Sequence, residues 1–220
     1  MFDEIEKKWA SMGGADGLLG KPYGESRKTI DDNGKYHRFD NGSIYWSPDS
    51  GAFYIYGVVE SKYTKMGYES SYLGFPKSDT IDLGDKRSYN NFTGGVIYCH
   101  PLFHCIALRG PILDRWREMG AEKSVMGYPV REIQATEDGK GECQHFQFGD
   151  IYSHPDHGIF EMRGRPRIEW YKLGGLNGKF GPPASEVTES EDGSYQNFKH
   201  GTIVWHAKQH KVDIQEHGTA

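Results

Sequence analysis

Phe39-Asp40-Asn41-Gly42-Ser43-Ile44-Tyr45-Trp46 is the stretch that decides the fold, because the chain repeats its pattern three more times. Each copy has a Phe, a Gly three residues later and an Ile two residues beyond that Gly. The later copies begin at Phe92, Phe146 and Phe198, so the steps between them are 53, 54 and 52 residues. A fixed period of this length predicts one supersecondary unit repeated four times, each burying its apolar face against its neighbours.

A short helical pattern precedes each copy of this strand. In the first repeat, Ile5, Trp9 and Met12 stand at i, i+4 and i+7, and Gly13 follows them. This spacing places three side chains on one helix face, and a glycine in the left-handed region commonly ends a helix. Such short helices are unstable alone, so we expect them to dock on the strands. The glycines predicted to end the four helices are Gly13, Gly67, Gly120 and Gly174.

A four-residue signature, which we call the corner, follows each of these glycines. Its copies are Leu19-Gly20-Lys21-Pro22, Leu73-Gly74-Phe75-Pro76, Met126-Gly127-Tyr128-Pro129 and Phe180-Gly181-Pro182-Pro183. A Gly that can take positive φ, next to a Pro of fixed φ, predicts a rigid turn.

An acidic residue stands three positions beyond each corner proline. These acids are Glu25, Asp79, Glu132 and Glu186. We interpret them as acceptors for backbone N–H groups, because a residue kept in every repeat usually serves the repeat. Contacts to sugar hydroxyl groups, or paired-carboxylate hydrolysis, are the alternatives.

The recurring corner, acid, strand and glycine resemble the LGFP-repeat family over essentially the whole chain, and Leu73-Gly74-Phe75-Pro76 is the namesake sequence. The resemblance implies repeats arranged around a pseudo-symmetry axis. It also implies a role in binding or anchoring to the cell wall, since family members occur mainly in actinobacterial envelope proteins, often attached to mycoloyltransferases or amidases.

The expected fold is therefore a β-rich repeat protein in which each unit has short β-strands and one short α-helix. We expect a single domain over 1–220, with repeats at approximately 1–57, 58–110, 111–164 and 165–220. The four units would form a closed, pseudo-fourfold, propeller-like ring, and an open solenoid is the alternative. Closure is inferred from the family resemblance and from an apparent lack of polar capping repeats at either end.

Composition excludes some classes of partner. The net charge of −5 and the pI near 6.1 provide no basic field for nucleic acid or for an anionic membrane surface, and no apolar run is long enough to insert into a membrane. The N-terminus lacks the apolar region of a signal peptide, so the sequence predicts a cytoplasmic protein, with non-classical export or cell-envelope association as the alternative. Three cysteines without a spaced framework argue against a disulfide-stapled domain.

Aromatic side chains near the repeated strand are the candidate ligand-binding residues. Trp46 and Trp205 stand at one repeat position, where the middle repeats have Cys99 and Ser153, so the fold does not demand an aromatic there. In a ring, the first and last repeats would be neighbours, and the two indoles would flank one groove that binds sugar rings. Packing between repeats is the alternative. The remaining candidates are Tyr98 and Tyr152, with Asp40, Asn41 and Asp150 as partners for sugar hydroxyl groups.

Three histidines share another repeat position, and they are His100, His154 and His206. Imidazoles that converge on an axis can bind zinc, whereas separate exposed turns would keep them apart. Nucleophile elbows, zinc-hydrolase helices and phosphate-binding glycine loops are all missing from the sequence. The sequence thus predicts a non-catalytic, multivalent carbohydrate- or cell-wall-glycan-binding protein without a cofactor. A protein-interaction or structural scaffold is the first alternative, and a metal-dependent hydrolase is the second.

Overall fold

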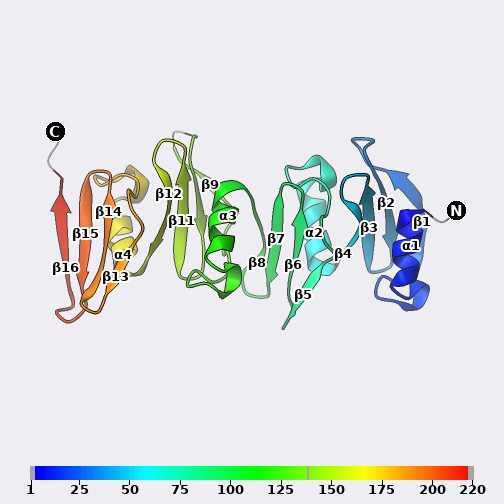
Figure 1. Cartoon of the computed structure of the whole chain (residues 1–220), viewed down its shortest axis with the longest axis horizontal. Helices are drawn as coiled ribbons and strands as arrows, with labels where there is room; N and C mark the ends of the chain where they lie inside the picture. The colour runs from blue at the N-terminus through cyan, green and yellow to red at the C-terminus, as the bar shows by residue number, and fades with distance from the viewer. Residues whose placement is uncertain (1–2, 138, 218–220) are drawn as a thin grey trace. The chain divides into compact units, whose positions relative to one another are not determined.

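The computed structural model describes residues 3–137 and 139–217, and the chain divides into two compact units, unit 1 (1–110) and unit 2 (111–220). Each unit contains two four-stranded antiparallel sheets, and within every sheet each strand pairs with the strands next to it in sequence (Figure 1). The prediction of a β-rich array with one short α-helix before each sheet is confirmed. The prediction of one domain over the whole chain stays a prediction.

Unit 1 contains the first and second repeats. Its helices are α1 (Glu4–Ser11) and α2 (Gly57–Met66). The first sheet consists of β1 (Pro22–Lys28), β2 (Lys35–Phe39), β3 (Gly42–Ser47) and β4 (Gly51–Tyr56). The second sheet consists of β5 (Ile81–Gly84), β6 (Arg87–Phe92), β7 (Gly95–His100) and β8 (His104–Leu108).

Unit 2 contains the third and fourth repeats. Its helices are α3 (Gly110–Glu118), which begins at the last residue of unit 1, and α4 (Gly164–Lys172). The third sheet consists of β9 (Gln134–Ala135), β10 (Glu142–His145), β11 (Gly149–His154) and β12 (Gly158–Arg163). The fourth sheet consists of β13 (Thr188–Ser190), β14 (Gly193–Phe198), β15 (Gly201–His206) and β16 (Lys211–Glu216).

The corner glycines confirm the turn that the sequence predicts. The φ angles are +74° at Gly20, +64° at Gly74, +69° at Gly127 and +65° at Gly181, where a side chain is disfavoured. The large aromatic residue of each helix donates a hydrogen bond to the carbonyl oxygen of its corner glycine. These bonds run from Trp9 Nε1 (2.9 Å), Tyr63 Oη (2.8 Å), Trp116 Nε1 (3.1 Å) and Trp170 Nε1 (2.8 Å). Each helix is thereby fixed to the turn that follows it.

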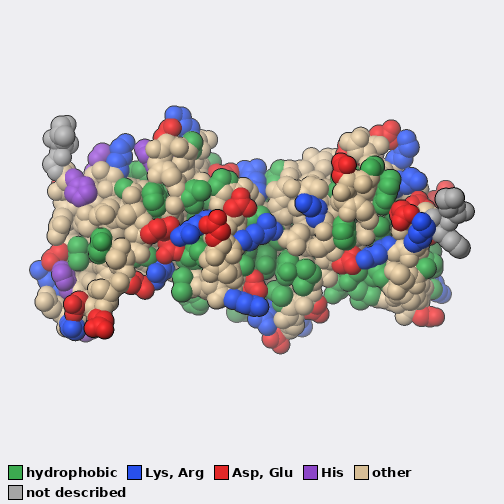
Figure 2. Space-filling model, viewed as in Figure 1, with side chains coloured by type: hydrophobic (Ala, Val, Ile, Leu, Met, Phe, Trp, Pro, Cys, Tyr) green, Lys and Arg blue, Asp and Glu red, His purple; other side chains and the backbone are tan. Residues whose placement is uncertain are grey.

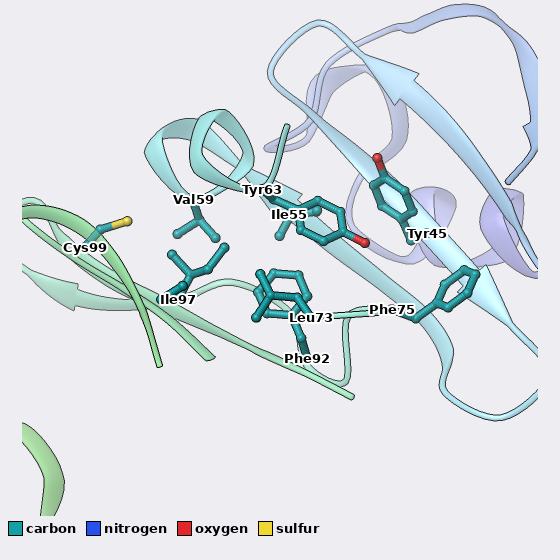
Figure 3. Packing of buried hydrophobic residues seen from close by; sticks show 10 residues of the cluster. Tyr45, Ile55, Val59, Tyr63, Leu73, Phe75, Phe92, Ile97 and Cys99 are labelled. Atoms are coloured by element: carbon teal, nitrogen blue, oxygen red, sulfur yellow. The ribbon is translucent and has the colours of Figure 1, made fainter. Parts of the chain in front are cut away.

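Strand alternation divides the core between two helices. Ile44 of β3 packs with Ile5 of α1, whereas the next residue, Tyr45, points to the other face and meets Tyr63 of α2 edge-on at 5.4 Å. Figure 3 shows Tyr45 and Tyr63 in the cluster that joins the first two repeats. The predicted burial of the leading phenylalanines is confirmed, with exposures of 7% for Phe39, 4% for Phe92, 2% for Phe146 and 1% for Phe198.

Two of the repeated acids join successive repeats. Asp79 of the second repeat accepts the backbone N–H of Tyr54 in β4 (3.0 Å) and the ammonium of Lys8 (2.5 Å). In unit 2, Glu186 makes the same two contacts, with the Glu161 N–H in β12 (2.8 Å) and Arg115 (2.7 Å). Their carboxylates therefore act as backbone acceptors, as interpreted from the sequence. Asp79 and Glu186 thus each accept a hydrogen bond from a backbone N–H group on the last strand of the preceding sheet.

The fourth sheet has a polar outer face, which the sequence analysis missed. Gln215 of β16 occupies the position that Ile55 and Met162 fill in the first and third sheets, where both are fully buried. Asp213 likewise replaces Phe53. A polar outer face is typical of a terminal capping repeat. The described residues form four four-stranded sheets, and closure of the repeats into a propeller-like ring stays a prediction.

Candidate functional site

A hollow of about 510 Å³ in unit 1, which we call the lysine hollow, is a candidate binding site. One face of α2 supplies Val58, Ser61, Lys62 and Lys65, spaced i, i+3, i+4 and i+7. Lys86 comes from the turn between β5 and β6. The end of the β7–β8 hairpin completes the lining with Cys99, His100, Pro101, His104 and Cys105. Ten residues thus line the hollow, three of them lysines, and Asp and Glu are missing from this set.

A disulfide between Cys99 and Cys105 closes the hairpin beneath the hollow. The two cysteines are directly paired across β7 and β8, so their Cα atoms lie only 3.9 Å apart. The expectation that the cysteines form no disulfide is therefore wrong. The odd cysteine is Cys143, which is buried in unit 2, and burial raises the pKa of its thiol to about 12. Cys143 is accordingly an inert core residue.

His100 is fixed in the wall of the lysine hollow by its own turn. Its Nδ1 accepts the backbone N–H of Leu102 (3.1 Å), and its ring stacks on Phe103 at a centroid distance of 4.7 Å. Burial, and secondarily the charge of Arg87, lower the pKa of His100. The imidazole is therefore neutral at pH 7, and its proton lies on Nε2.

The lining of the hollow combines lysine ammonium groups, which can bind anions, with apolar side chains. Lys65 and Lys86 are exposed and carry mobile ammonium groups, while Val58, Pro101 and the disulfide offer apolar surface. Ammonium groups bind carboxylate or phosphate as point charges, and apolar surface covers the C–H faces of a sugar ring. A volume within the usual range for small-ligand pockets leaves room for one or two sugar residues.

The two tryptophans predicted to bind glycans are both engaged in packing. Trp46 is partly buried against the cluster around Ile5 and Leu19, on the α1 face of the first sheet. The ring of Trp205 lies beneath the guanidinium of Arg165, at 5.1 Å. Each indole thus has a partner on at least one face. Their role as a shared platform stays a prediction.

The other predicted ligand residues have structural contacts within their own repeats. Tyr98 and Tyr152 are 7% and 2% exposed, because they point into the packing face of their sheets. Asp40 and Asn41 are exposed but serve the corner. Asp40 accepts the backbone N–H of Lys21 (3.0 Å), and Asn41 donates to the Leu18 carbonyl (3.2 Å). Asp40 and Asn41 directly precede β3, whereas Trp46 lies near its end. An extended strand of this length separates the Cα atoms of Asn41 and Trp46 by about 16 Å.

Asp150 is fully buried and belongs to a structural ion pair. Its carboxylate accepts hydrogen bonds from Arg167 (2.5 and 3.0 Å), His145 (2.6 Å) and Tyr171 (2.8 Å). Burial alone would raise the pKa of Asp150, but these hydrogen bonds and the Arg167 charge outweigh it and hold that pKa below its usual value. The carboxylate is thus engaged within the fold, and its role as a sugar-hydroxyl partner stays a prediction.

The first repeat fills the same junction with a different pair. Ser43 of β3, at the repeat position of Asp150, donates a hydrogen bond to Glu60 of α2, which stands at the position of Arg167. At the same repeat positions, the second sheet has Val96 and the third helix has Leu113, and each is buried. Within each unit, the strand residue and the following helix residue are therefore matched in chemistry.

The three candidate zinc ligands have separate local partners. His154 Nδ1 accepts the Asp156 N–H (3.0 Å) within its own turn, as His100 does in its turn, and His206 Nε2 lies 2.9 Å from Asp213. Within residues 3–137 and 139–217, the structure contains no group of three or more His, Cys, Asp or Glu side chains that could hold a metal ion. The predicted convergence of His100, His154 and His206 is therefore not observed.

Sequence reasoning missed Lys62, Lys65 and Lys86. A signal for the first two was present, since Val58, Ser61, Lys62 and Lys65 share one helix face. Lys86 lies in a different element, and the sequence does not indicate that it approaches α2.

Figure 2 shows acidic and basic side chains interspersed over the face that it presents. A helix with the length and apolar character needed to cross a membrane does not occur among the described residues.

Comparisons with known proteins give one strong result. No curated protein matches the chain. Solved structures with local similarity include the extracellular domain of the putative one component system BT4673 from B. thetaiotaomicron, at 11% identity and a TM-score of 0.20. The match covers 90% of this chain and 30% of that one. They also include the hemopexin fold protein CP4 from cow pea (12% identity, 88% of this chain and 90% of that one, TM-score 0.22). Such low TM-scores carry no argument.

The family comparison is decisive by contrast. The LGFP repeat model matches three consecutive segments, residues 19–71, 73–124 and 126–178. Each match begins at the first residue of a corner. Each matched segment consists of a corner, a sheet and the helix that follows it. The fourth sheet comes after the last match and has the polar outer face described above. The chain belongs to the LGFP repeat family.

Proposed function

We propose that this chain is a non-catalytic glycan-binding protein of the cell envelope, and that unit 1 binds an anionic glycan in the lysine hollow. The carrying observation is the concentration of Lys62, Lys65 and Lys86 around one hollow in a protein of net charge −5. Carboxylate or phosphate groups of the polymer would contact the ammonium groups. The sugar rings would cover Val58 and the disulfide.

Two observations support the cell envelope as the location. LGFP repeats are associated with cell walls, as the family resemblance implies, and Cys99 and Cys105 form a disulfide. Structural disulfides persist in oxidising compartments and are rare in the cytosol. These points favour the envelope over the cytoplasmic location expected from the sequence. A polymeric ligand would also let weak sites gain avidity, since several repeats or several copies could bind one chain.

The lysine hollow can be tested with polymers of different charge. Polygalacturonate, a glycerol-phosphate polymer and neutral dextran would be titrated into the intact chain by calorimetry at low and high salt. We expect binding of the two anionic polymers, weakened by salt because exposed charges are screened. The Lys65→Glu/Lys86→Glu variant should bind at least about tenfold more weakly, which corresponds to roughly 1.4 kcal/mol.

A matched control separates the hollow from net charge. The Lys21→Glu/Lys28→Glu variant makes the same change of charge on exposed lysines of unit 1 outside the hollow. It should bind as the parent chain does. Equal losses in both double variants would show that the hollow is not the site. Absence of binding to all three polymers would favour the scaffold function instead.

A further inference from the structure

Unit 1 contains a second hollow, of about 380 Å³, on its first repeat. The N-terminal end of α1 and the strands β1 and β2 supply its lining. We call it the junction hollow, and its lining includes Asp3, Ile5, Glu6, Glu25, Ser26 and His37. Three of these side chains are acids, so the junction hollow differs in charge from the lysine hollow.

The equivalent positions of the second repeat bind the sheet that precedes them. Glu25 corresponds to Asp79, which accepts the Tyr54 N–H of β4 (3.0 Å). Ser26 corresponds to Thr80, whose N–H donates to the Tyr54 carbonyl (3.1 Å). Both contacts are made to the outer edge of β4, the last strand of the first sheet.

The position of Glu6 contacts the preceding sheet as well. In the second repeat, this position is Glu60, which accepts a hydrogen bond from Ser43 of β3. In the fourth repeat, it is Arg167, which binds Asp150 of β11 (2.5 Å). The helix residue at this position therefore meets the preceding sheet in both units.

Unit 2 repeats the contacts made to the edge strand. Glu186 accepts the Glu161 N–H of β12 (2.8 Å), and Gln196 Nε2 donates to the Glu161 carbonyl (2.8 Å). Gln196 stands at the repeat position of His37. In both units, the positions that line the junction hollow are thus occupied by the last strand of the preceding sheet.

The first repeat holds its acid in the same backbone frame. His37 Nε2 lies 3.2 Å from the Gly24 carbonyl oxygen, just as Gln196 Nε2 lies 2.9 Å from the Ser185 carbonyl oxygen. Glu25 is exposed, and among the described residues its carboxylate has no hydrogen bond or ion pair. Glu25 is therefore placed to bind a strand edge that residues 3–137 and 139–217 do not supply.

The occupied junctions show what such a partner must present. Besides the strand N–H, Asp79 binds the ammonium of Lys8 (2.5 Å), and Glu186 binds the guanidinium of Arg115 (2.7 Å). Each cation comes from the helix that precedes the bound sheet. A partner for Glu25 would therefore combine an open strand edge with a lysine or arginine, and the acids of the junction hollow favour that charge.

A second copy of this chain lacks these features. On its fourth sheet, Gln215 replaces the buried Ile55 of the first sheet. In α4, Glu169 stands at the repeat position of Lys8. Glu169 would approach Glu25 in such a contact, and like charges at an interface disfavour association.

We infer that the junction hollow docks the last sheet of a different LGFP-repeat protein, one with a basic residue at the position of Lys8. The contact is heterologous, because the two proteins use different surfaces. Backbone hydrogen bonds to the edge strand supply affinity, and the ion pair with Glu25 supplies specificity. The inference goes beyond the proposed glycan binding and does not depend on the lysine hollow.

The fourth sheet of this chain can be converted into a probe with the required chemistry. The probe chain carries Glu169→Lys, Asp213→Phe and Gln215→Ile, which introduce the residues of the first repeat, and Glu25→Lys, which blocks its own junction hollow. It would be titrated into the fluorescently labelled parent chain, and sedimentation velocity would report association. We expect a one-to-one complex with a Kd in the micromolar range.

Matched variants of the labelled chain test the site. Glu25→Lys should weaken binding of the probe chain at least about tenfold. Asp49→Lys makes the same change of charge at an exposed residue of unit 1 outside the junction hollow, and it should bind as the parent does. A second probe chain that omits Glu169→Lys should bind more weakly than the first but more tightly than the unmodified chain. Its sheet is changed only on exposed β16, so it serves as the probe if the first fails to fold.

Four results would overturn the inference. They are the absence of a complex with either probe chain, equal binding by Glu25→Lys and Asp49→Lys, equally tight association of the parent with itself, and displacement of the probe chain by tetralysine. The third result would make a second copy the partner, and the fourth would reduce the hollow to a surface that attracts any basic chain.

Discussion

Replacing Asp150 by alanine should lower the free energy of unfolding by about 3–5 kcal/mol, because it leaves the Arg167 guanidinium without its partner in a partly buried site. His145 and Tyr171 would lose the same acceptor. Urea denaturation followed by tryptophan fluorescence measures the loss, since Trp116 and Trp170 report on unit 2. A change below about 1 kcal/mol, as for an exposed ion pair, would contradict the structural role.

The second repeat provides the matched control for this variant. At the repeat positions of Asp150 and Arg167, Val96 and Leu113 show that each position also accepts a buried apolar side chain. Asp150→Val/Arg167→Leu should therefore recover most of the stability lost in Asp150→Ala, because both charges are removed together. If the double variant is as unstable as the single one, the cost comes from packing and not from the unpaired charge.

The same carboxylate predicts an acid-sensitive contribution to stability. The pKa of Asp150 is lowered in the folded chain, so its contribution is complete above the unfolded value of about 3.9 and is lost as pH falls through the folded value. Between neutral pH and pH 3, the parent should lose more stability than Asp150→Val/Arg167→Leu. Denaturation curves at stepped pH measure this difference, and parallel curves would contradict it.

Phe198→Ala is the second change with a large expected effect, with a loss of about 3–5 kcal/mol in the free energy of unfolding. Phe198 is 1% exposed and stacks on Trp170 at 5.7 Å and next to Phe180 at 6.2 Å. It thus joins strand, helix and corner of the fourth repeat. Thermal and urea denaturation measure the loss.

Phe148→Ala is the control for this prediction. Phe148 lies in the same unit but is 64% exposed, so its removal should change stability by less than about 0.5 kcal/mol. Similar losses in Phe148→Ala and Phe198→Ala would show that the repeated strand position does not define the core.

The repeated features were predictable because each is determined within one repeat. Gly20 needs positive φ for its turn, and Phe39 and Ile44 are placed by strand alternation, so one copy suffices to predict the others. The disulfide was also predictable, since five residues separate Cys99 from Cys105 and the two cysteines pair directly across one hairpin. The number of cysteines alone does not indicate this pairing.

Other features depend on contacts between elements and could not be obtained in this way. Asp150 resembles a solvent-facing acid in sequence, and only the position of α4 brings Arg167 to it. The lysine hollow likewise depends on Lys86, which the turn between β5 and β6 brings to the same hollow as Lys62 and Lys65 of α2. The candidate sites therefore lie where the repeats differ, whereas the fold lies where they agree.

The matched pairs at the repeat junctions have a consequence for how such a chain can evolve. Exchanging α2 with α4 would bring Glu60 opposite Asp150, two acids in a buried place, and would set Arg167 against Ser43. These side-chain pairs thus determine which helix can follow which sheet. Unequal recombination between similar gene segments would place residues of mismatched chemistry opposite each other. Within each unit, the order of sheet and helix is therefore specified by two side chains, Ser43 with Glu60 in unit 1 and Asp150 with Arg167 in unit 2.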